Sequence, residues 1–581
     1  MHMPDLQAAS TSRDVTDTFY GYNHKMKIGA GEFFDMKNLS SRDFPMLSTR
    51  MPRALVKHLH EPQGLLAKET LCYVNEGTLY VDGEPTELTG LKAGKKQIVS
   101  MGAYICIFPD KMYYNTADTS DYGSMEAFFS PPGTVTYQLC LLTGEELEPI
   151  VSDTEPAEPE NLSYWLDTST NSLKQYNSNS GGWVTIVTVY TKITFETYGD
   201  VPGMFKIFDG ITIGGTPFPN ELDGSKLIYG IGGDATHQDY IIVVGLIDSY
   251  ISSAQAVSIS RTVPNLDYVC ECQNRLWGCY YGPSGTGNLN EIYCCALGDF
   301  RNWSVYQGIS TDSWTASVGS DGPWTGAINY LGYPTFFKEE RIHRVNVSAT
   351  GGHSITETVC RGVQRGSAGS LAIVNETLFY KSRSDVCAYQ GGFPDAVSAA
   401  LGEVNYSDAV AGAYGDCYYI SMKSEEGWNL FVYDTSNGLW TKQDDLHVTS
   451  FARVGDELYA IDEDNELLLA LRGTVGAPEV EQNLSWMSQS GILYYEYPDR
   501  KYISRYDIRL SAKVGSTVNV FIQYDSDGLW RPFGSYHFKG LNTITFPIRP
   551  RRCDHMELRL TGNGPVKIYS IARILEQGSD V

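Results

Sequence analysis

A short sequence unit recurs through the middle of the chain: an apolar strand, a tight polar turn, and a leucine with an aromatic residue that open the next strand. Clear copies are Val74–Tyr80, Val374–Phe379 and Val454–Tyr459. The polar turn reverses the chain, and the leucine and aromatic side chains can pack the returning strand on both of its faces. The unit therefore predicts consecutive antiparallel hairpins.

The spacing of the units indicates how the hairpins are arranged. The aromatic markers of the later copies are spaced by 43, 39 and 41 residues and are Phe336, Phe379, Tyr418 and Tyr459. A period of about 40 residues with several strands in each unit is typical of a β-propeller. Counting the looser copies as well predicts about seven blades, with six or eight as alternatives.

Composition agrees with an all-β chain. At 581 residues the chain is too long for one hydrophobic core. Its 39 Tyr, 57 Gly and 25 Pro favour strands joined by turns, and long helical patterns are nearly absent. Most of the 12 Cys lie in apolar runs, and the spacing of metal ligands is missing, so we expect buried reduced thiols and neither a disulfide framework nor a zinc site.

The repeats are interrupted and then stop, which predicts a multi-part chain. An acidic, proline-rich segment at 149–159 lies inside a long insertion, and a strand pattern typical of a β-sandwich follows the last repeat. The first 50 residues suggest an extended arm, either a flexible terminus or a strap onto a neighbouring subunit. The expected parts are an N-terminal arm (1–50), the first propeller blades (51–124), one or more inserted β modules (125–262), the remaining blades (263–473) and a C-terminal β-sandwich (479–577).

No motif of a known catalytic device is present. The chain has no GxSxG elbow, HExxH pair or P-loop, and its acidic residues form no recognisable catalytic pair. We therefore expect no catalytic residue, no cofactor and no bound metal, and hence a protein that is not an enzyme. A propeller glycosidase is the least favoured alternative.

Two sets of residues are candidate contact sites. Trp165 and Trp183 lie in the insertion and could stack on a glycan or a partner, with core packing as the more ordinary alternative. The basic run in this acidic chain contains Arg549, Arg551 and Arg552. We assign it to an inter-subunit or inter-domain contact and not to nucleic acid, because no aromatic platform interleaves with the arginines.

The overall charge excludes ordinary nucleic-acid binding. The formal net charge is −25 and the pI is about 4.8. Such a field repels phosphates, so DNA could pass such a protein without being held. The N-terminus does not have the pattern of a signal peptide, and the longest apolar run, at 241–247, is too short to cross a bilayer, so we expect no membrane association.

Five segments resemble tailed-phage and prophage virion proteins, namely Asp14–Asn23, Glu32–Leu39, Asn274–Cys279, Gly326–Lys338 and Ile548–His555. In architecture the chain looks like the propeller-containing tail-nozzle or packaged-DNA stabilisation proteins of short-tailed phages. The resemblance implies a ring of identical subunits that extends the DNA channel below the portal, and it carries over no catalytic residue.

The sequence thus predicts a structural protein of a phage neck or tail, made in the host cytoplasm and located in the virion. Its expected partners are copies of itself in a ring, other virion proteins (portal, adaptor or tail components), and DNA that passes without specific binding. The alternative is a tail-associated protein that binds a host receptor or glycan.

Overall fold

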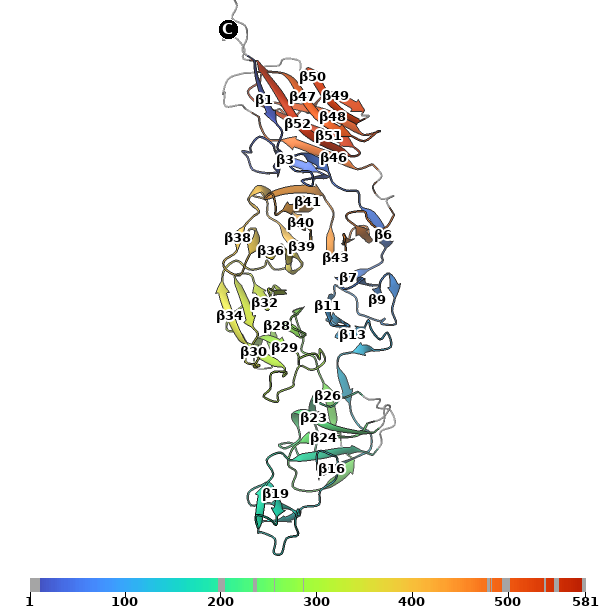
Figure 1. The fold of residues 1–581 in the computed structure, drawn as a ribbon, viewed down its shortest axis with the longest axis vertical. Helices are drawn as coiled ribbons and strands as arrows, with labels where there is room; N and C mark the ends of the chain where they lie inside the picture. The colour runs from blue at the N-terminus through green and yellow to red at the C-terminus, as the bar shows by residue number, and fades with distance from the viewer. Residues whose placement is uncertain are drawn as a thin grey trace, which may run out of the picture.

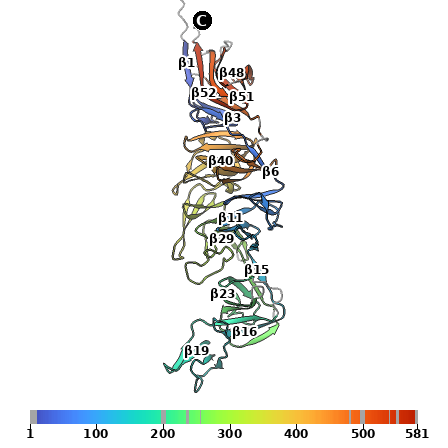
Figure 2. The same cartoon turned by 45° about the vertical axis from the view of Figure 1, so that its right-hand side comes forward.

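Three β-rich parts follow one another along the long axis of the computed structural model (Figures 1 and 2). A β-sandwich lies at one end, a β-propeller in the middle and an inserted β domain at the other end. The structure describes residues 11–196, 204–233, 238–254, 256–285, 287–477, 481, 483–493, 502–537, 540–547 and 553–576. The predicted fold class, an all-β propeller with an inserted β module and a C-terminal sandwich, is confirmed.

Seven antiparallel units of four strands form the propeller in the described residues. Blades 1 to 3 contain β7 (Pro62–Ala67), β8 (Leu71–Asn75), β9 (Thr78–Val81) and β10 (Glu84–Pro85); β11 (Gln97–Met101), β12 (Tyr104–Phe108), β13 (Met112–Asn115) and β14 (Tyr122–Ser124); and β27 (Tyr268–Glu271), β28 (Leu276–Ser284), β29 (Gly287–Cys294) and β30 (Trp314–Ser317). Blades 4 and 5 contain β31 (Gly326–Tyr330), β32 (Tyr333–Lys338), β33 (Arg341–Asn346) and β34 (Ser354–Val359); and β35 (Ala372–Val374), β36 (Thr377–Lys381), β37 (Val386–Tyr389) and β38 (Asp395–Ala396).

Blades 6 and 7 complete the ring. They contain β39 (Ser407–Tyr414), β40 (Cys417–Ser424), β41 (Gly427–Asp434) and β42 (Leu439–Asp444); and β43 (Val448–Val454), β44 (Glu457–Asp462), β45 (Leu467–Ala470) and β6 (Ala54–His58). The short 3-10 helices η1 (Ala368–Ser370) and η2 (Ala399–Leu401) flank blade 5.

The ring is closed by a strand from the other end of the chain. Strand β6 pairs antiparallel with β45, placing His58 opposite Leu467 and Ala54 opposite Ala470. The strand at residues 54–58 therefore belongs to the last blade, whereas the sequence placed the whole range 51–124 in the first blades. Because β6 continues directly into β7 of blade 1, its hydrogen bonds with β45 hold the first blade to the last, and the two cannot separate without breaking this pairing.

The recurring sequence unit forms the hairpin that we expected. In blade 1, Asn75 faces Thr78 across a two-residue turn in which Glu76 and Gly77 have φ values of 49° and 68°. Positive φ at both central residues gives the turn whose twist matches that of the strands. The following leucine, Leu79, is fully buried. The recurring unit thus contains both the residues that the turn needs and the leucine that the core needs. Because these lie next to each other in the sequence, the unit could be recognised without knowing the fold.

The cysteines also behave as expected. All 12 thiols are free, and ten of them are buried while Cys360 and Cys417 are half-buried. Burial raises the pKa of Cys270 well above its ordinary value, and raises that of Cys272 to about 11. Thiols held in the neutral form are poor nucleophiles, so their role in the blades is packing.

A buried histidine in blade 4 makes stability depend on pH. His343 is fully buried, its Nε2 lies 2.9 Å from the Ser320 hydroxyl, and Glu357, Lys338 and Arg341 are the charged groups that act on it. Burial lowers its pKa from 6.5 to about 4.

We predict that this histidine contributes an acid-sensitive part of the stability. Between pH 6.5 and 4 the unfolded chain binds a proton that native His343 does not, so stability is full above pH 6.5 and falls by roughly 2–3 kcal/mol toward pH 4. Urea unfolding at pH 7 and pH 4.5 should show a smaller pH dependence in His343→Gln than in the unmodified chain. An identical dependence in both proteins would contradict this origin.

The sandwich is built from both ends of the chain. One sheet contains β4 (Leu39–Ser40), β5 (Leu47–Thr49), β52 (Val566–Glu576), β47 (Tyr502–Ala512) and β50 (Gly540–Pro547), with β1 (Thr11–Thr16) also paired to β52. The facing strands are β2 (Gly21–Tyr22), β3 (Glu32–Lys37), β46 (Ser485–Ser490), β51 (Met556–Asn563), β48 (Thr517–Tyr524) and β49 (Arg531–His537). The N-terminal segment from residue 11 onward is therefore not a free arm, because its strands pair within the same chain.

The insertion leaves the propeller between blades 2 and 3 and contains two sheets. The larger consists of β15 (Ala127–Phe129), β26 (Ser258–Arg261), β22 (Gly210–Gly214), β23 (Gly224–Gly233), β24 (Gln238–Val244), β21 (Tyr190–Phe195), β16 (Thr134–Cys140) and β25 (Ile251–Ala254). The smaller, which we call the tip module (residues 142–188), consists of β17 (Ile150–Ser152), β18 (Tyr164–Asp167), β19 (Ser172–Asn177) and β20 (Gly182–Thr185). The tip module lies at the end farthest from the sandwich (Figure 1).

Within the described residues, no helix is long and apolar enough to span a bilayer.

Candidate functional site

A single sheet crosses the boundary between the propeller and the sandwich. The last strand of blade 6, β42, pairs with β2, and the ten-stranded order β39-β40-β41-β42-β2-β3-β46-β51-β48-β49 continues into the sandwich. Tyr22 of β2 faces Trp440 of β42, which is buried and donates its indole N–H to the carbonyl of Val397 at 2.8 Å. We call this boundary the junction.

The junction requires glycine at residue 21. Gly21 has a φ of +78°, and a Cβ built there would lie 2.2 Å from the carbonyl oxygen of Trp440. Its neighbour Tyr22 is buried. Only a residue without a side chain allows β2 to approach β42 this closely.

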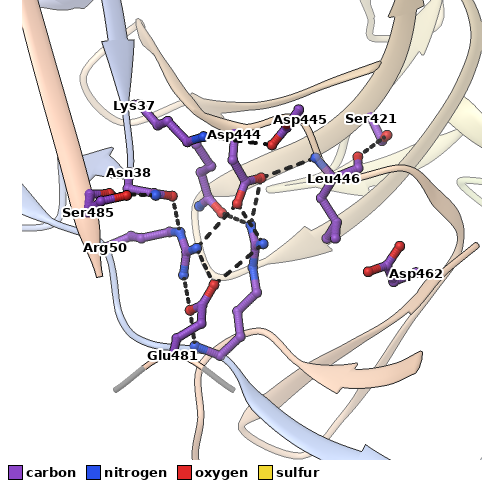
Figure 3. A network of polar contacts seen from close by, with 12 residues as sticks. Lys37, Asn38, Arg50, Ser421, Asp444, Asp445, Leu446, Asp462, Glu481 and Ser485 are labelled. Atoms are coloured by element: carbon purple, nitrogen blue, oxygen red, sulfur yellow. Dashed lines mark hydrogen bonds and ion pairs between the residues drawn. The ribbon is translucent and has the colours of Figure 1, made fainter. Parts of the chain in front are cut away.

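Buried charges reinforce the junction (Figure 3). Arg53 donates to Asp444 through two bonds, Nη1 to Oδ2 at 2.7 Å and Nη2 to Oδ1 at 3.0 Å. Arg50 donates to the two carboxylate oxygens of Glu481 at 2.7 Å each, and also to Asp444 at 3.2 Å. The side chains of both arginines are 4% exposed. Each arginine thus makes a bidentate pair with a carboxylate, and these two pairs fix the orientation of the segments that carry the four side chains.

The network joins three segments that are distant in sequence. The arginines follow β5 in the N-terminal segment, Asp444 ends β42 in blade 6, and Glu481 precedes the first C-terminal strand, β46. Arg50 also donates through Nε to the side chain of Asn38, whose amide donates to the carbonyl of Ser485. The linker between propeller and sandwich is therefore attached to both of them (Figure 3).

The arginines keep both carboxylates ionised. Burial disfavours the charged form of Asp444, but Arg53 and Arg50 outweigh it, so the pKa of Asp444 is lowered. The same balance, with burial opposed by Arg50 and Arg53, lowers the pKa of Glu481. The ion pairs are therefore intact at neutral pH. Sequence reasoning missed this cluster, since its members show no local motif and meet only through the fold.

The tip module places the two candidate tryptophans in contact, with Trp165 buried and Trp183 half-buried. Trp165 is 5% exposed, and its ring meets that of Trp183 edge-on at 5.4 Å. The Trp165 indole donates to the carbonyl of Ser152 at 3.1 Å, and Lys174 lies over its ring at 4.5 Å. Trp183 is half-buried. The position of Trp165 matches the packing alternative, because a ring covered on this scale offers no face to a sugar.

The structure does not place the other candidate contact residues. Arg549, Arg551 and Arg552 lie outside the described residues. Among the residues that are described, no group of three or more His, Cys, Asp or Glu side chains could hold a metal ion.

Comparisons with known proteins identify no family. No family model matches the chain, and no curated protein matches its sequence. Solved structures that resemble it include the exo-beta-1,3-galactanase from Phanerochaete chrysosporium, with TM-score 0.22, 8% identity, 52% of this chain and 94% of that chain covered. Another is the phage phi92 endosialidase, with TM-score 0.18, 10% identity, 75% of this chain and 57% of that chain covered.

These structures correct one prediction. We expected a protein that is not an enzyme, whereas the structures of similar fold include a galactanase and an endosialidase. Absence of a catalytic motif was the wrong ground for that prediction, because catalytic side chains on propeller blades are brought together by the fold and not by sequence. At these TM-scores the likeness assigns no activity to this chain.

Proposed function

We propose that this chain is a structural component of a phage neck or tail, and that copies of it form a ring around the DNA channel as a nozzle or stabilisation component. The observation that carries the proposal is the junction, where one ten-stranded sheet and a buried ion network join propeller and sandwich. Because the propeller and the sandwich are joined rigidly, an elongated subunit of this kind can keep its shape when it packs beside other copies in the wall of a tube. The phage-like sequence segments agree with this role.

The charge of the chain suits a channel. A net charge of −25 repels DNA phosphates, so a wall made of such subunits would not retain passing DNA. A basic wall would bind the same DNA by releasing counterions and would slow its passage. The proposed partners are further copies of the chain, adjoining portal, adaptor or tail proteins, and unretained DNA.

We predict that the purified protein forms a closed ring, alone or on its portal or adaptor partner. Light scattering combined with size-exclusion chromatography should give a mass several times 64.4 kDa, and negative-stain electron microscopy should show a central hole. Substituting Arg549, Arg551 and Arg552 by alanine should lower the mass toward a monomer if these residues form the inter-subunit contact. Substituting the exposed Arg42 serves as the control for loss of positive charge. Location of the protein only on tail fibres, or its absence from virions, would overturn the proposal.

A second candidate function is receptor or glycan binding by the tip module. The favouring observation is that the tip module lies at the far end of the molecule and exposes apolar side chains, among them Ile150 (48%), Val151 (54%), Val184 (53%) and Val187 (96%). Cys140 and Tyr190 face each other across β16 and β21, so residues 142–188 can be replaced by a short turn. Loss of binding to host cells in that variant, with the ring intact, would favour this function over the nozzle.

A further inference from the structure

A pocket of about 330 Å³ opens beside the junction, between blade 6 and strands β2 and β3. Its volume is within the range of small-molecule sites, about 300–1,000 Å³. Tyr22 and Asp35 line it from the N-terminal strands. Tyr406 and Glu426 line it from the loops that precede β39 and follow β40. The pocket is distinct from the buried arginine network and from the tip module.

The lining is strongly acidic. Asp35, Glu403, Glu425 and Glu426 contribute four carboxylates. The positive group in the lining is Lys442, whose Nζ lies 3.7 Å from Asp35 Oδ1. Arg559 of β51 also acts on Asp35, but its guanidinium is held over the ring of Trp530 at 3.8 Å and donates to Gln489. The pocket therefore keeps an excess of negative charge that a cation would relieve.

Two buried tyrosines line the pocket with their hydrogen-bonding capacity unused. Tyr22 is 3% exposed and Tyr406 is 8% exposed, and neither hydroxyl has a hydrogen-bond partner among the described residues. Burial, together with the charges of Asp35 and Glu426, raises the pKa of both phenols, so they are neutral. The two hydroxyl oxygens are not among the fully buried atoms, although the side chains that carry them are covered, so both hydroxyls remain accessible from the pocket and free to bond a ligand.

From this combination we propose that the pocket binds a guanidinium group, carried either by a small molecule or by an arginine of a second copy of the chain. A metal ion is disfavoured, because no group of three or more acidic, His or Cys side chains in the described residues is arranged to hold one. A neutral sugar would leave the repulsion among the carboxylates in place. A guanidinium brings positive charge and five N–H donors, and needs only acceptors in return.

The surrounding rings also suit this ligand. Tyr406 meets Phe431 edge-on at 5.6 Å, and His24 stacks on Tyr22 with ring centroids 5.8 Å apart. His24 donates through Nδ1 to the carbonyl of Phe34 at 2.9 Å, which leaves Nε2 as an acceptor in the neutral ring. Guanidinium is planar and weakly hydrated, so it loses less hydration free energy than an ammonium when it enters a site walled by aromatic rings.

The test is calorimetric titration of the full chain with L-arginine amide. L-citrulline amide, which keeps the α-amino group but carries an uncharged ureido group of nearly the same shape in place of the guanidinium, is the comparison ligand. We expect arginine amide to bind and citrulline amide not to bind. Glu426→Gln and Tyr406→Phe should each weaken binding by roughly 10–100-fold, since each removes a hydrogen bond to a charged group. Asp456→Asn, which removes a carboxylate from an exposed turn of blade 7, should leave binding unchanged. Equal melting temperatures exclude misfolding as the cause.

Light scattering separates the two sources of the guanidinium. If a second copy supplies it, the unmodified chain self-associates, arginine amide shifts it toward the monomer, and Glu426→Gln does the same without ligand. If a small molecule supplies it, the ligand binds without changing the mass. Equal binding of arginine and citrulline amides, or no effect of either amide on heat or mass, would overturn the proposal. A ring that forms without a response to arginine amide would leave the proposed function standing while this inference fails.

Discussion

Replacing Arg53 by alanine should destabilise the protein by about 3–5 kcal/mol, because it leaves Asp444 buried without two of its three hydrogen bonds from arginine. The side chain of Asp444 is 10% exposed and accepts two bonds from Arg53, whereas Arg50 reaches it through one longer bond of 3.2 Å. Equilibrium unfolding in urea measures the loss. Since the pair is shielded from solvent, the effect should change little with salt.

A double-mutant cycle tests whether the pair itself is responsible. Arg53→Ala and Asp444→Ala should each be costly, and the double variant should cost less than their sum. Arg42→Ala provides the exposed control, since Arg42 lies 3.3 Å from Asp43 with a side chain 42% exposed, and should cost no more than about 1 kcal/mol. A cost below about 1 kcal/mol for Arg53→Ala would contradict the role we give the buried network.

Alanine at residue 21 should separate the unfolding of the sandwich from that of the propeller. The new Cβ meets the Trp440 carbonyl oxygen at 2.2 Å, and the φ of +78° is strained for any residue with a side chain. The Cβ is fixed to the backbone of β2 and the oxygen belongs to the backbone of β42, so neither can turn aside. Strand β2 must therefore move away from β42, at a cost of about 3 kcal/mol or more. Differential scanning calorimetry should then resolve two transitions where the unmodified chain gives one.

Gly438 provides the matched control for this substitution. It lies in the turn before β42, has a φ of +66°, and a Cβ there meets no atom within 4 Å. Gly438→Ala should therefore show only the conformational penalty of about 1–2 kcal/mol and keep a single transition. If both variants behave alike, the close approach of β2 to β42 does not hold the two parts together.

How much of the fold could be predicted depended on how far apart in sequence the interacting residues lie. The blade hairpins were predictable because their turn and their buried leucine lie within seven residues, as in Val74–Tyr80. The N-terminal strands were not, since β1 pairs with β52 at the opposite end of the chain. Nothing local in Thr11–Thr16 specifies a partner more than 550 residues away, so the segment resembled an arm.

The same limit applied to the sites. Arg53 and Asp444 are 391 residues apart, and the acidic pocket combines β2, β3 and blade 6, so no spacing rule could find either. Trp165 and Trp183 could be placed in the insertion from the sequence, yet composition does not say which side chains the fold of the tip module covers. Long-range pairing decides burial, and burial decides whether a side chain is available to a ligand.

The strand that closes the propeller also determines when the chain can finish folding. Strand β6 is synthesised near the beginning, and its partner β45 only after residue 467. At about 5–20 residues per second, translation separates the two by roughly 20–80 s. During that interval β6 lacks its partner, and β1, β3 and β5 still lack the C-terminal strands β52 and β46 with which they pair. The ring and the sandwich are therefore completed only after most of the chain has been made. Ribosome-bound chains truncated before residue 467 should therefore present these strand edges to chaperones.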